Sequence, residues 1–475
     1  MDTHDTHEEG KATKHTLTRR RDGAGVLRST VGPAKLGEGL EEVEKEGGMR
    51  SLPVEASDSP ESQESTPVDF ATVRATVEEH LPALWPAIEA GLSTCATLLL
   101  SDNVNPVALI YVGPPSAGKT TVAGMFEGVM VNGYSLVYRS DKFTPASFVT
   151  HSARMTETQL AKVDLLPKIR FKILLTPELS PIFKGRPDEL AERLSIITRV
   201  LDGQGLTTDS GVYGRRGYTG DYLFAWIGCT TPFDDRVWEV MAQLGSRLFF
   251  LVMDTGTTST VEDMVKAHSE PLHYNEKVEI CKKKVGYFVE ALFTWYGGVR
   301  KVQWDAQGDP TEVLTRIAQC ATLLAVMRTP IPRDLGVTLQ PESPLRANSV
   351  LYNLARGHAL VNGRTQLSVE DLPMVARVAV SSVPQGRRNV FLALAKNEGQ
   401  PLTVKQVENT GVGSRHTAER VMGALEQLGV MKFEKEGTGK AARLTIRPEW
   451  SWCMAEDFRA LLLEGTTCQE SGVEN

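Results

Sequence analysis

The feature that most constrains the fold is a short apolar segment followed directly by a glycine-rich loop. Residues 107–112, VALIYV, form a continuous apolar run typical of a strand buried on both faces of a sheet. The loop GPPSAGKTT, residues 113–121, comes next, and the segment 121–130 after it is expected to be a helix. This order of strand, loop and helix is what a phosphate-binding P-loop requires. The sequence therefore predicts an α/β fold that carries a nucleotide site.

The loop has the residue types that hold a nucleoside triphosphate. It matches the pattern G-x-x-x-x-G-K-[ST], in which glycines let backbone N–H groups curl around phosphates. We expect Lys119 to reach the β and γ oxygens and the Thr120 hydroxyl to coordinate Mg²⁺. The expected cofactors are therefore ATP and Mg²⁺. The residues predicted to line this site are Gly113, Pro114, Pro115, Ser116, Ala117, Gly118, Lys119, Thr120 and Thr121.

The pattern around this loop predicts the fold class and the domains. Helical segments separate four further apolar runs, which indicate strands at 134–139, 171–176, 222–228 and 247–253. This alternation favours a mostly parallel, doubly wound sheet. The first 69 residues contain no aromatic residue and cannot bury enough apolar surface to offset their ordering entropy. The predicted parts are a disordered tail (1–69), an ATPase core (70–260), a helical lid (261–385), a winged-helix domain (386–450) and a C-terminal extension (451–475).

Composition narrows the environment and the partners. The net charge is -7, so any contact with DNA has to come from local basic patches. The six cysteines are scattered without a CxxC pair, which predicts neither a zinc site nor a disulfide framework. No apolar run is long enough to cross a bilayer, and the first residues lack the apolar core of a signal peptide. We expect a cytoplasmic protein without membrane contact.

An acid follows the strand expected at 171–176. P-loop ATPases need a residue that orients the attacking water, and Glu178 is the candidate. Pro177 stands where an aspartate would normally help to hold Mg²⁺, so that Thr176, water or another acid such as Asp141 would have to substitute. Alternatively, Glu178 only caps a helix that begins near residue 179.

Three further polar residues stand at places where they could contact a triphosphate. Thr231 ends a strand before a proline and could bond the water or the γ-phosphate, although a simple strand-end turn explains it equally well. Arg247 directly precedes an apolar strand and could neutralise charge on the γ-phosphate of a neighbouring subunit, which would make assembly obligatory. Arg346 begins an amphipathic helix and could contact the same nucleotide from the lid. Taken singly, such arginines are more often surface or ion-pairing residues.

In order along the chain, five segments resemble the AAA+ ATPase family: GPPSAGKT, ILLTPE, GCTTP, LGSRLFF and a lid helix beginning PLRANSV. The last three resemble its minichromosome maintenance branch, and LARGHALVNGRTQLSVEDL, residues 354–372, is similar to the pattern that follows that lid helix. The resemblance covers residues 70–383. Two features depart from it: TPE replaces the usual acidic pair, and we see no N-terminal DNA-binding or zinc domain of that branch.

The resemblance implies an AAA+ fold, a homo-oligomeric ring and defined residue roles. Lys119 and Thr120 would serve phosphate and Mg²⁺, and Glu178 would act on the water. The implied sensors and finger are Thr231 as first sensor, Arg247 as an arginine finger acting on the next subunit, and Arg346 as second sensor.

Two basic regions are candidates for DNA contact. The segment 203–228 predicts a β-hairpin whose turn carries Arg215 and Arg216 beside tyrosines, a combination suited to phosphates and stacked bases. A structural hairpin with solvated arginines is the alternative. The segment 386–450 resembles winged-helix domains, in which the longer helix enters a major groove and the wing contacts phosphate. Many such domains bind protein instead. The residues predicted to contact DNA there are Arg415, His416, Arg420, Lys440 and Arg443.

Taken together, the sequence predicts an oligomeric AAA+ ATPase that moves along or remodels DNA or a DNA-bound complex, in the manner of a helicase. The alternative is an ATP-controlled DNA-binding switch or loader with little motor activity, which the missing aspartate before Glu178 favours. A third hypothesis is a P-loop protein that remodels other proteins without touching DNA.

Overall fold

The computed structural model describes residues 69–463, apart from residues 153, 213, 246, 254–260, 262–264, 266–268, 270, 332–338 and 435–441. These residues belong to one compact unit, Ser65–Asn475. The predicted tail, except for Asp69, and the last twelve residues of the predicted C-terminal extension lie outside the described residues.

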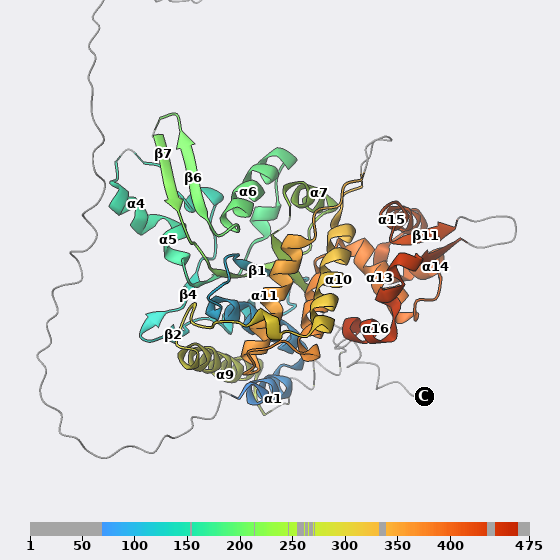
Figure 1. The fold of residues 1–475 in the computed structure, drawn as a ribbon, viewed down its shortest axis with the longest axis horizontal. Helices are drawn as coiled ribbons and strands as arrows, with labels where there is room; N and C mark the ends of the chain where they lie inside the picture. Colours follow the sequence, from blue (N-terminus) through green and yellow to red (C-terminus); the bar gives the residue numbers. More distant parts are fainter. Residues whose placement is uncertain are drawn as a thin grey trace, which may run out of the picture. The chain divides into compact units, whose positions relative to one another are not determined.

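Five parallel strands form the central sheet, in the order β4-β5-β8-β1-β9 (Figure 1). They are β1 (Val107–Val112), β4 (Val137–Arg139), β5 (Ile173–Thr176), β8 (Ala225–Thr230) and β9 (Leu248–Val252). The predicted mixed α/β fold with a parallel sheet is therefore confirmed. The predicted strand at 134–139 is divided in the structure. Only its second half, β4, joins the central sheet, whereas Tyr134–Ser135 (β3) pairs with Met130–Val131 (β2) in a separate hairpin. Its turn is Asn132-Gly133 with positive φ at both residues, the commonest two-residue hairpin turn.

Helices cover both faces of the sheet. Successive side chains of a strand point to opposite faces, so each strand contributes to an apolar cluster on each side. In β1, Val107, Leu109 and Tyr111 pack into one apolar cluster, and Ala108 and Ile110 pack into another. The first cluster includes residues of α2, α11 and α12, and the second includes residues of α6 and α7. The helices up to β9 are α1 (Phe70–His80), α2 (Trp85–Ala96), α3 (Lys119–Gly124), α4 (Glu157–Val163), α5 (Leu165–Ile169), α6 (Pro187–Val200) and α7 (Asp235–Leu244).

Helix α3 is shorter than the sequence predicts. The prediction was a helix over 121–130, but α3 ends at Gly124. The chain then continues in i→i+3 turns, with Phe126 N–H donating to Ala123 O at 3.2 Å and Glu127 N–H donating to Gly124 O at 3.2 Å. Gly128 follows with φ 77°, a conformation that ends a helix.

The segment after β9 is helical, as predicted. Its described helices are α9 (Tyr274–Trp295), α10 (Thr311–Arg328), α11 (Leu345–Val361) and α12 (Leu372–Ser381). Helix α9 lies beside α1 (Figure 1). Within the described residues, no helix is both long and apolar enough to cross a membrane.

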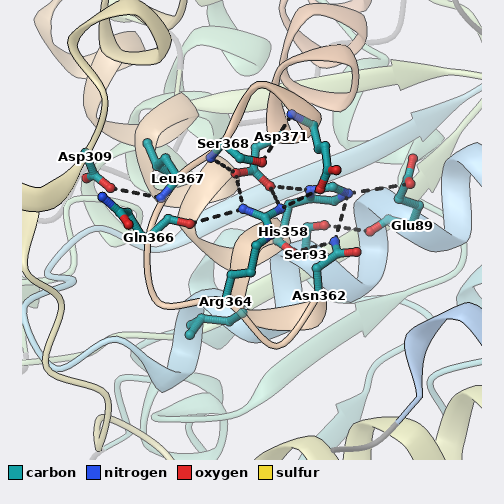
Figure 2. Close-up of polar contacts among 12 residues, drawn as sticks. Glu89, Ser93, Asp309, His358, Asn362, Arg364, Gln366, Leu367, Ser368 and Asp371 are labelled. Carbon is teal, nitrogen blue, oxygen red and sulfur yellow. Dashed lines mark hydrogen bonds and ion pairs between the residues drawn. The ribbon is translucent and has the colours of Figure 1, made fainter.

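The motif at residues 354–372 folds into α11 and the turn before α12, where its polar side chains form a buried network. Figure 2 shows His358 between two acids: its Nδ1 lies 2.6 Å from Asp371 Oδ1 and its Nε2 lies 3.5 Å from Glu89 Oε1. Arg364 donates to both oxygens of Asp371 at 2.9 and 2.6 Å. Burial alone would lower the pKa of His358, but the hydrogen bonds to these acids outweigh burial and raise the pKa to about 9. The network therefore joins α2, α11 and the start of α12 through a charged histidine.

The C-terminal part contains a small helical unit with a three-stranded antiparallel sheet, in the order β10-β12-β11. It has the predicted order of helix, short helix, glycine turn, longer helix and two strands, with one additional short strand, β10. Helix α16 then packs back onto the unit through the buried Phe458. The elements are α13 (Gln385–Lys396), β10 (Leu402–Thr403), α14 (Val404–Val407), α15 (Arg415–Gln427), β11 (Met431–Glu434), β12 (Arg443–Ile446) and α16 (Glu456–Leu463).

Candidate nucleotide-binding site

The predicted phosphate loop follows the carboxyl end of β1. Gly113 N–H donates to Thr230 O at 3.3 Å, which fixes the start of the loop against the end of β8. A Cβ added at Gly113 would lie 2.9 Å from Met253 O, and one at Gly118 would lie 2.6 Å from Leu84 Cδ2. Gly118 also has φ 77°, which L side chains rarely adopt. Local packing therefore requires glycine at position 113, and the backbone conformation requires it at position 118.

Lys119 lies along this loop. Its Nζ donates to Gly113 O at 2.8 Å and to Pro114 O at 2.6 Å. Burial lowers the pKa of Lys119, and the nearby thiol of Cys229 and carboxylate of Glu178 oppose that effect. The ammonium therefore lies at the curve of the loop. It is close enough to the carboxylate of Glu178, the acid expected to act on water, for the two charges to attract each other.

The remaining loop residues divide into accessible and engaged side chains. Pro114, Pro115, Ser116 and Thr120 are exposed, and Ala117 is buried. The hydroxyl of Thr121 lies 3.1 Å from the hydroxyl of Tyr274, the first residue of α9. Thr120, the predicted Mg²⁺ ligand, is thus accessible, whereas the Thr121 side chain holds α3 against α9.

Glu178, Ser180 and Thr231 lie together at the same edge of the sheet, after β5 and β8. Glu178 is exposed, and its Oε1 accepts the Ser180 N–H at 2.7 Å. Ser180 begins the short helix η4 (Ser180–Phe183), whose N-cap is Leu179, so Glu178 binds the first N–H of that helix from the residue before the cap. Ser180 Oγ lies 3.2 Å from Thr231 Oγ1. Thr230 is 1% exposed, so Thr231 is the accessible threonine of the pair.

Two substitutes that the sequence offered for the missing aspartate are excluded by their surroundings. Thr176 is 1% exposed, and its hydroxyl accepts the indole N–H of Trp226 at 3.0 Å. Asp141 pairs with Arg139 at 2.8 Å, after the edge strand β4. Neither is placed to hold a metal at the loop after β1.

The residues present still fit Mg²⁺ bound through a nucleotide. Mg²⁺ usually keeps several waters and takes one or two protein oxygens together with substrate phosphates. The accessible Thr120 hydroxyl and the Glu178 carboxylate supply such oxygens. Within the described residues, no group of three or more His, Cys, Asp or Glu side chains forms a metal cage without a nucleotide.

The two predicted arginines lie together at the opposite edge of the sheet. Arg247 precedes β9, and Leu248 is in register with Ala108 near the start of β1. Arg247 Nε donates to Asp202 Oδ1 at 3.1 Å, and Arg346 donates to the same oxygen. Strand β1 has six residues, so the loop at its carboxyl end and the arginines near its amino end are about 20 Å apart. The arginines therefore do not contact the phosphate loop of their own chain.

The predicted hairpin is confirmed as β6 (Gly205–Ser210) paired with β7 (Gly214–Thr219), and it extends from the sheet beside α4 and α5 (Figure 1). Arg215 is exposed, as a DNA contact requires. The expectation for Arg216 is wrong: its Nη2 lies 2.5 Å from the buried Asp164, and its Nε donates to Thr150 O at 2.7 Å. Its side chain is 12% exposed, so Arg216 anchors the hairpin instead of facing solvent.

The candidate DNA contacts of the C-terminal unit differ in their surroundings. Arg415 and His416 are exposed in the first turn of α15, and Arg443 is exposed at the start of β12. Arg420 is also exposed, but it lies 3.8 Å from Asp235 of α7 and lines a cavity of about 520 Å³ between α7, α13 and α15. That side of α15 faces α7, which packs on the central sheet. Lys440 lies outside the described residues.

Sequence reasoning missed Ser180, Asp202 and Tyr274. Ser180 could have been found, because a hydroxyl two residues after Glu178 is in reach of the same site. Asp202 and Tyr274 carried no signal for these roles, since Arg247 and Arg346, which Asp202 joins, and Thr121, which Tyr274 contacts, are 45 or more residues away in the chain.

The comparisons with known proteins leave the family assignment as a resemblance. No protein-family model matches the chain, and no curated protein sequence is significantly similar to it. What the chain does must therefore be argued from its own geometry.

Proposed function

We propose that this chain is an ATPase of the AAA+ type that hydrolyses ATP between two copies and uses the reaction to move along or remodel DNA or a DNA-bound complex. The observation that carries the proposal is the meeting of three elements at one edge of the sheet. The loop around Lys119, the carboxylate of Glu178 and the hydroxyl of Thr231 follow three neighbouring parallel strands. Ligands of open parallel sheets bind outside the carboxyl ends of the strands.

The residues at this edge would divide the work of hydrolysis. The loop N–H groups and Lys119 would bind the phosphates, and Thr120 would hold Mg²⁺, which neutralises charge on the β and γ oxygens. Glu178 would orient water for in-line attack on the γ-phosphorus, with its second carboxylate oxygen available beside the one that accepts the Ser180 N–H. Thr231, held by Ser180, would donate to the water or to a γ-oxygen.

A neighbouring copy would supply the missing positive charge. Arg247 and Arg346 are about 20 Å from the phosphate loop of their own chain, so they can act only on a nucleotide bound elsewhere. A guanidinium placed at the γ-phosphate stabilises the charge of the transition state. On this proposal hydrolysis requires assembly, and a closed homo-oligomeric ring lets every subunit both receive and supply arginines.

DNA is proposed as the molecule that is moved or remodelled, because exposed basic residues lie on the β6–β7 hairpin and at the start of α15. Arg215 is exposed on the β6–β7 hairpin, and Arg415 and His416 are exposed at the start of α15. A helix presenting basic residues at its N-terminal half is suited to a major groove.

One observation favours a second function, an ATP-controlled DNA-binding switch or loader. Thr176 is bonded to Trp226 and Pro177 has no side-chain oxygen, so the chain offers few ligands to position Mg²⁺. Slow turnover would make the bound nucleotide a long-lived signal.

The steady-state ATPase rate, measured with and without single-stranded and double-stranded DNA, tests the proposal. The motor requires a rate that DNA stimulates and that both Glu178→Gln and Arg247→Ala abolish. Glu312→Gln changes an exposed carboxylate in the first turn of α10 and is the matched control for Glu178→Gln. A slow rate indifferent to DNA would leave the switch, and ATP turnover stimulated only by a protein partner would leave the remodeller of proteins. Absence of ATP binding would refute all three.

A further inference from the structure

Three arginines converge on one carboxylate near the amino edge of the sheet. Asp202 lies in the turn between α6 and the β6–β7 hairpin and is mostly buried, with a side chain 17% exposed. Its Oδ1 accepts from Arg247 Nε at 3.1 Å and from Arg346 Nη2, and its Oδ2 lies 3.4 Å from Arg199 Nη1. Arg199 is 52% exposed and comes from the end of α6 itself. Asp202 is therefore the shared partner of two arginines that come from distant parts of the chain.

The carboxylate offsets a repulsion between the two guanidiniums. Burial lowers the pKa of Arg346, the neighbouring Arg247 lowers it further, and Asp202 opposes both effects. Two like charges this close separate unless an opposite charge lies between them. An uncharged side chain of the same shape at position 202 would leave both arginines in place sterically but without that charge.

Asp202 also sets the direction of Arg247. The Nη1 of Arg247 donates to Leu244 O at 2.9 Å and to Gly245 O, while Nε is bound to Asp202. Gly245 makes room for this arrangement, because a Cβ there would lie 2.8 Å from Nη1. Within the described part of the chain, Nη2 makes no hydrogen bond, and it is the guanidinium nitrogen left to meet an external anion.

We propose that Asp202 is the positioning residue of the arginine pair: it holds Arg247 and Arg346 together so that both meet the terminal phosphate of a nucleotide bound to a neighbouring copy. This inference rests on the proposed function. Asp202 itself touches neither nucleotide nor water, and it acts through the two arginines. A displacement of about 1 Å in such a group can reduce a rate by about 100-fold, so the loss in Asp202→Asn is expected to lie between about tenfold and about 100-fold.

Mixing of complementary subunits tests this role. A Lys119→Ala chain cannot use its own nucleotide but can donate arginines, and an Arg247→Ala chain can bind ATP but lacks the finger. Each should be inactive alone, and a mixture of the two should regain ATPase activity. Asp202→Asn is then added to either chain. The loss should follow the donor: it should appear with Lys119→Ala/Asp202→Asn and not with Arg247→Ala/Asp202→Asn.

Controls separate positioning from folding. Asp202→Asn should lower the thermal unfolding temperature, because it leaves two partly buried guanidiniums without a counter-charge. Its ATP affinity should stay within error of the wild type, since its own phosphate loop lies at the other edge. Asp202→Glu keeps the charge and should restore at least part of the rate. Arg199→Ala removes the third arginine from the other carboxylate oxygen and should change the rate by less than about twofold, because exposed ion pairs contribute little.

The possible failures are distinguishable. If the Lys119→Ala and Arg247→Ala chains regain no activity when mixed, the shared site of the proposed function fails, and this inference fails with it. If the mixture regains activity but Asp202→Asn acts equally in either chain, or in neither, the shared site stands and the role of Asp202 is refuted.

Discussion

The buried charge of His358 predicts how the stability of the fold depends on pH. The pKa of His358 is raised from 6.5 to about 9 by its hydrogen bonds to Asp371 and Glu89, in spite of burial. A pKa difference of this size corresponds to about 3 kcal/mol of folding free energy. Because the folded-state pKa is the higher one, the contribution is complete below pH 6.5 and is lost as the pH rises through 9.

Urea unfolding followed by tryptophan fluorescence measures this contribution. The difference in free energy of unfolding between the wild type and His358→Gln is expected to shrink by about 2 kcal/mol between pH 6 and pH 8.5. His416→Gln removes an exposed histidine at the start of α15 and is the matched control. A wild-type advantage over His358→Gln that is the same at both pH values would refute the argument, because it would mean that the pKa of His358 does not differ between the folded and unfolded states.

Four further predictions address the loop, the hairpin and assembly. Gly118→Ala places a Cβ 2.6 Å from Leu84 at φ 77° and should abolish ATP binding, whereas Gly124→Ala meets nothing within 4 Å and should not; calorimetric titration with ATP compares them. Arg216→Ala leaves Asp164 buried without its cation and should destabilise the fold by about 3–5 kcal/mol, which chemical denaturation measures. Arg215→Ala should leave stability within about 0.5 kcal/mol of the wild type and reduce the salt dependence of DNA affinity; an unchanged salt slope would remove Arg215 from the interface. The ATPase rate per chain should rise with protein concentration and then level off, and a rate per chain that is constant at all concentrations would contradict a site shared between copies.

The strands and the loop could be predicted because their signals are local. A continuous apolar run such as VALIYV is by itself the signal of a strand whose side chains are buried on both faces of the sheet. The loop glycines are required by the conformation and packing of the backbone within a few residues. The end of α3 was predicted too late, because the apolar pattern continues past Gly124 while the backbone changes to i→i+3 turns.

The roles of the arginines could not be read locally, because they depend on distant partners. Arg215 and Arg216 are adjacent in β7 and therefore point to opposite sides of the strand. Only the fold reveals that Asp164, 52 residues earlier, lies on the side of Arg216. In the same way, Arg247 and Arg346 are separated by almost a hundred residues and meet only because both reach Asp202.

Asp202 also lies between the arginine pair and the β6–β7 hairpin, the two parts of the molecule that the proposed function assigns to the nucleotide and to DNA. It lies in the turn from which the β6–β7 hairpin starts, and Tyr222 N–H, just after the hairpin, donates to Gly203 O at 2.8 Å, which closes its base. The hairpin is held to α5 by Arg216 and Asp164, so it cannot shift freely relative to the body that carries it. The base of the hairpin and the arginine pair therefore meet at one turn of the chain, the turn that carries Asp202.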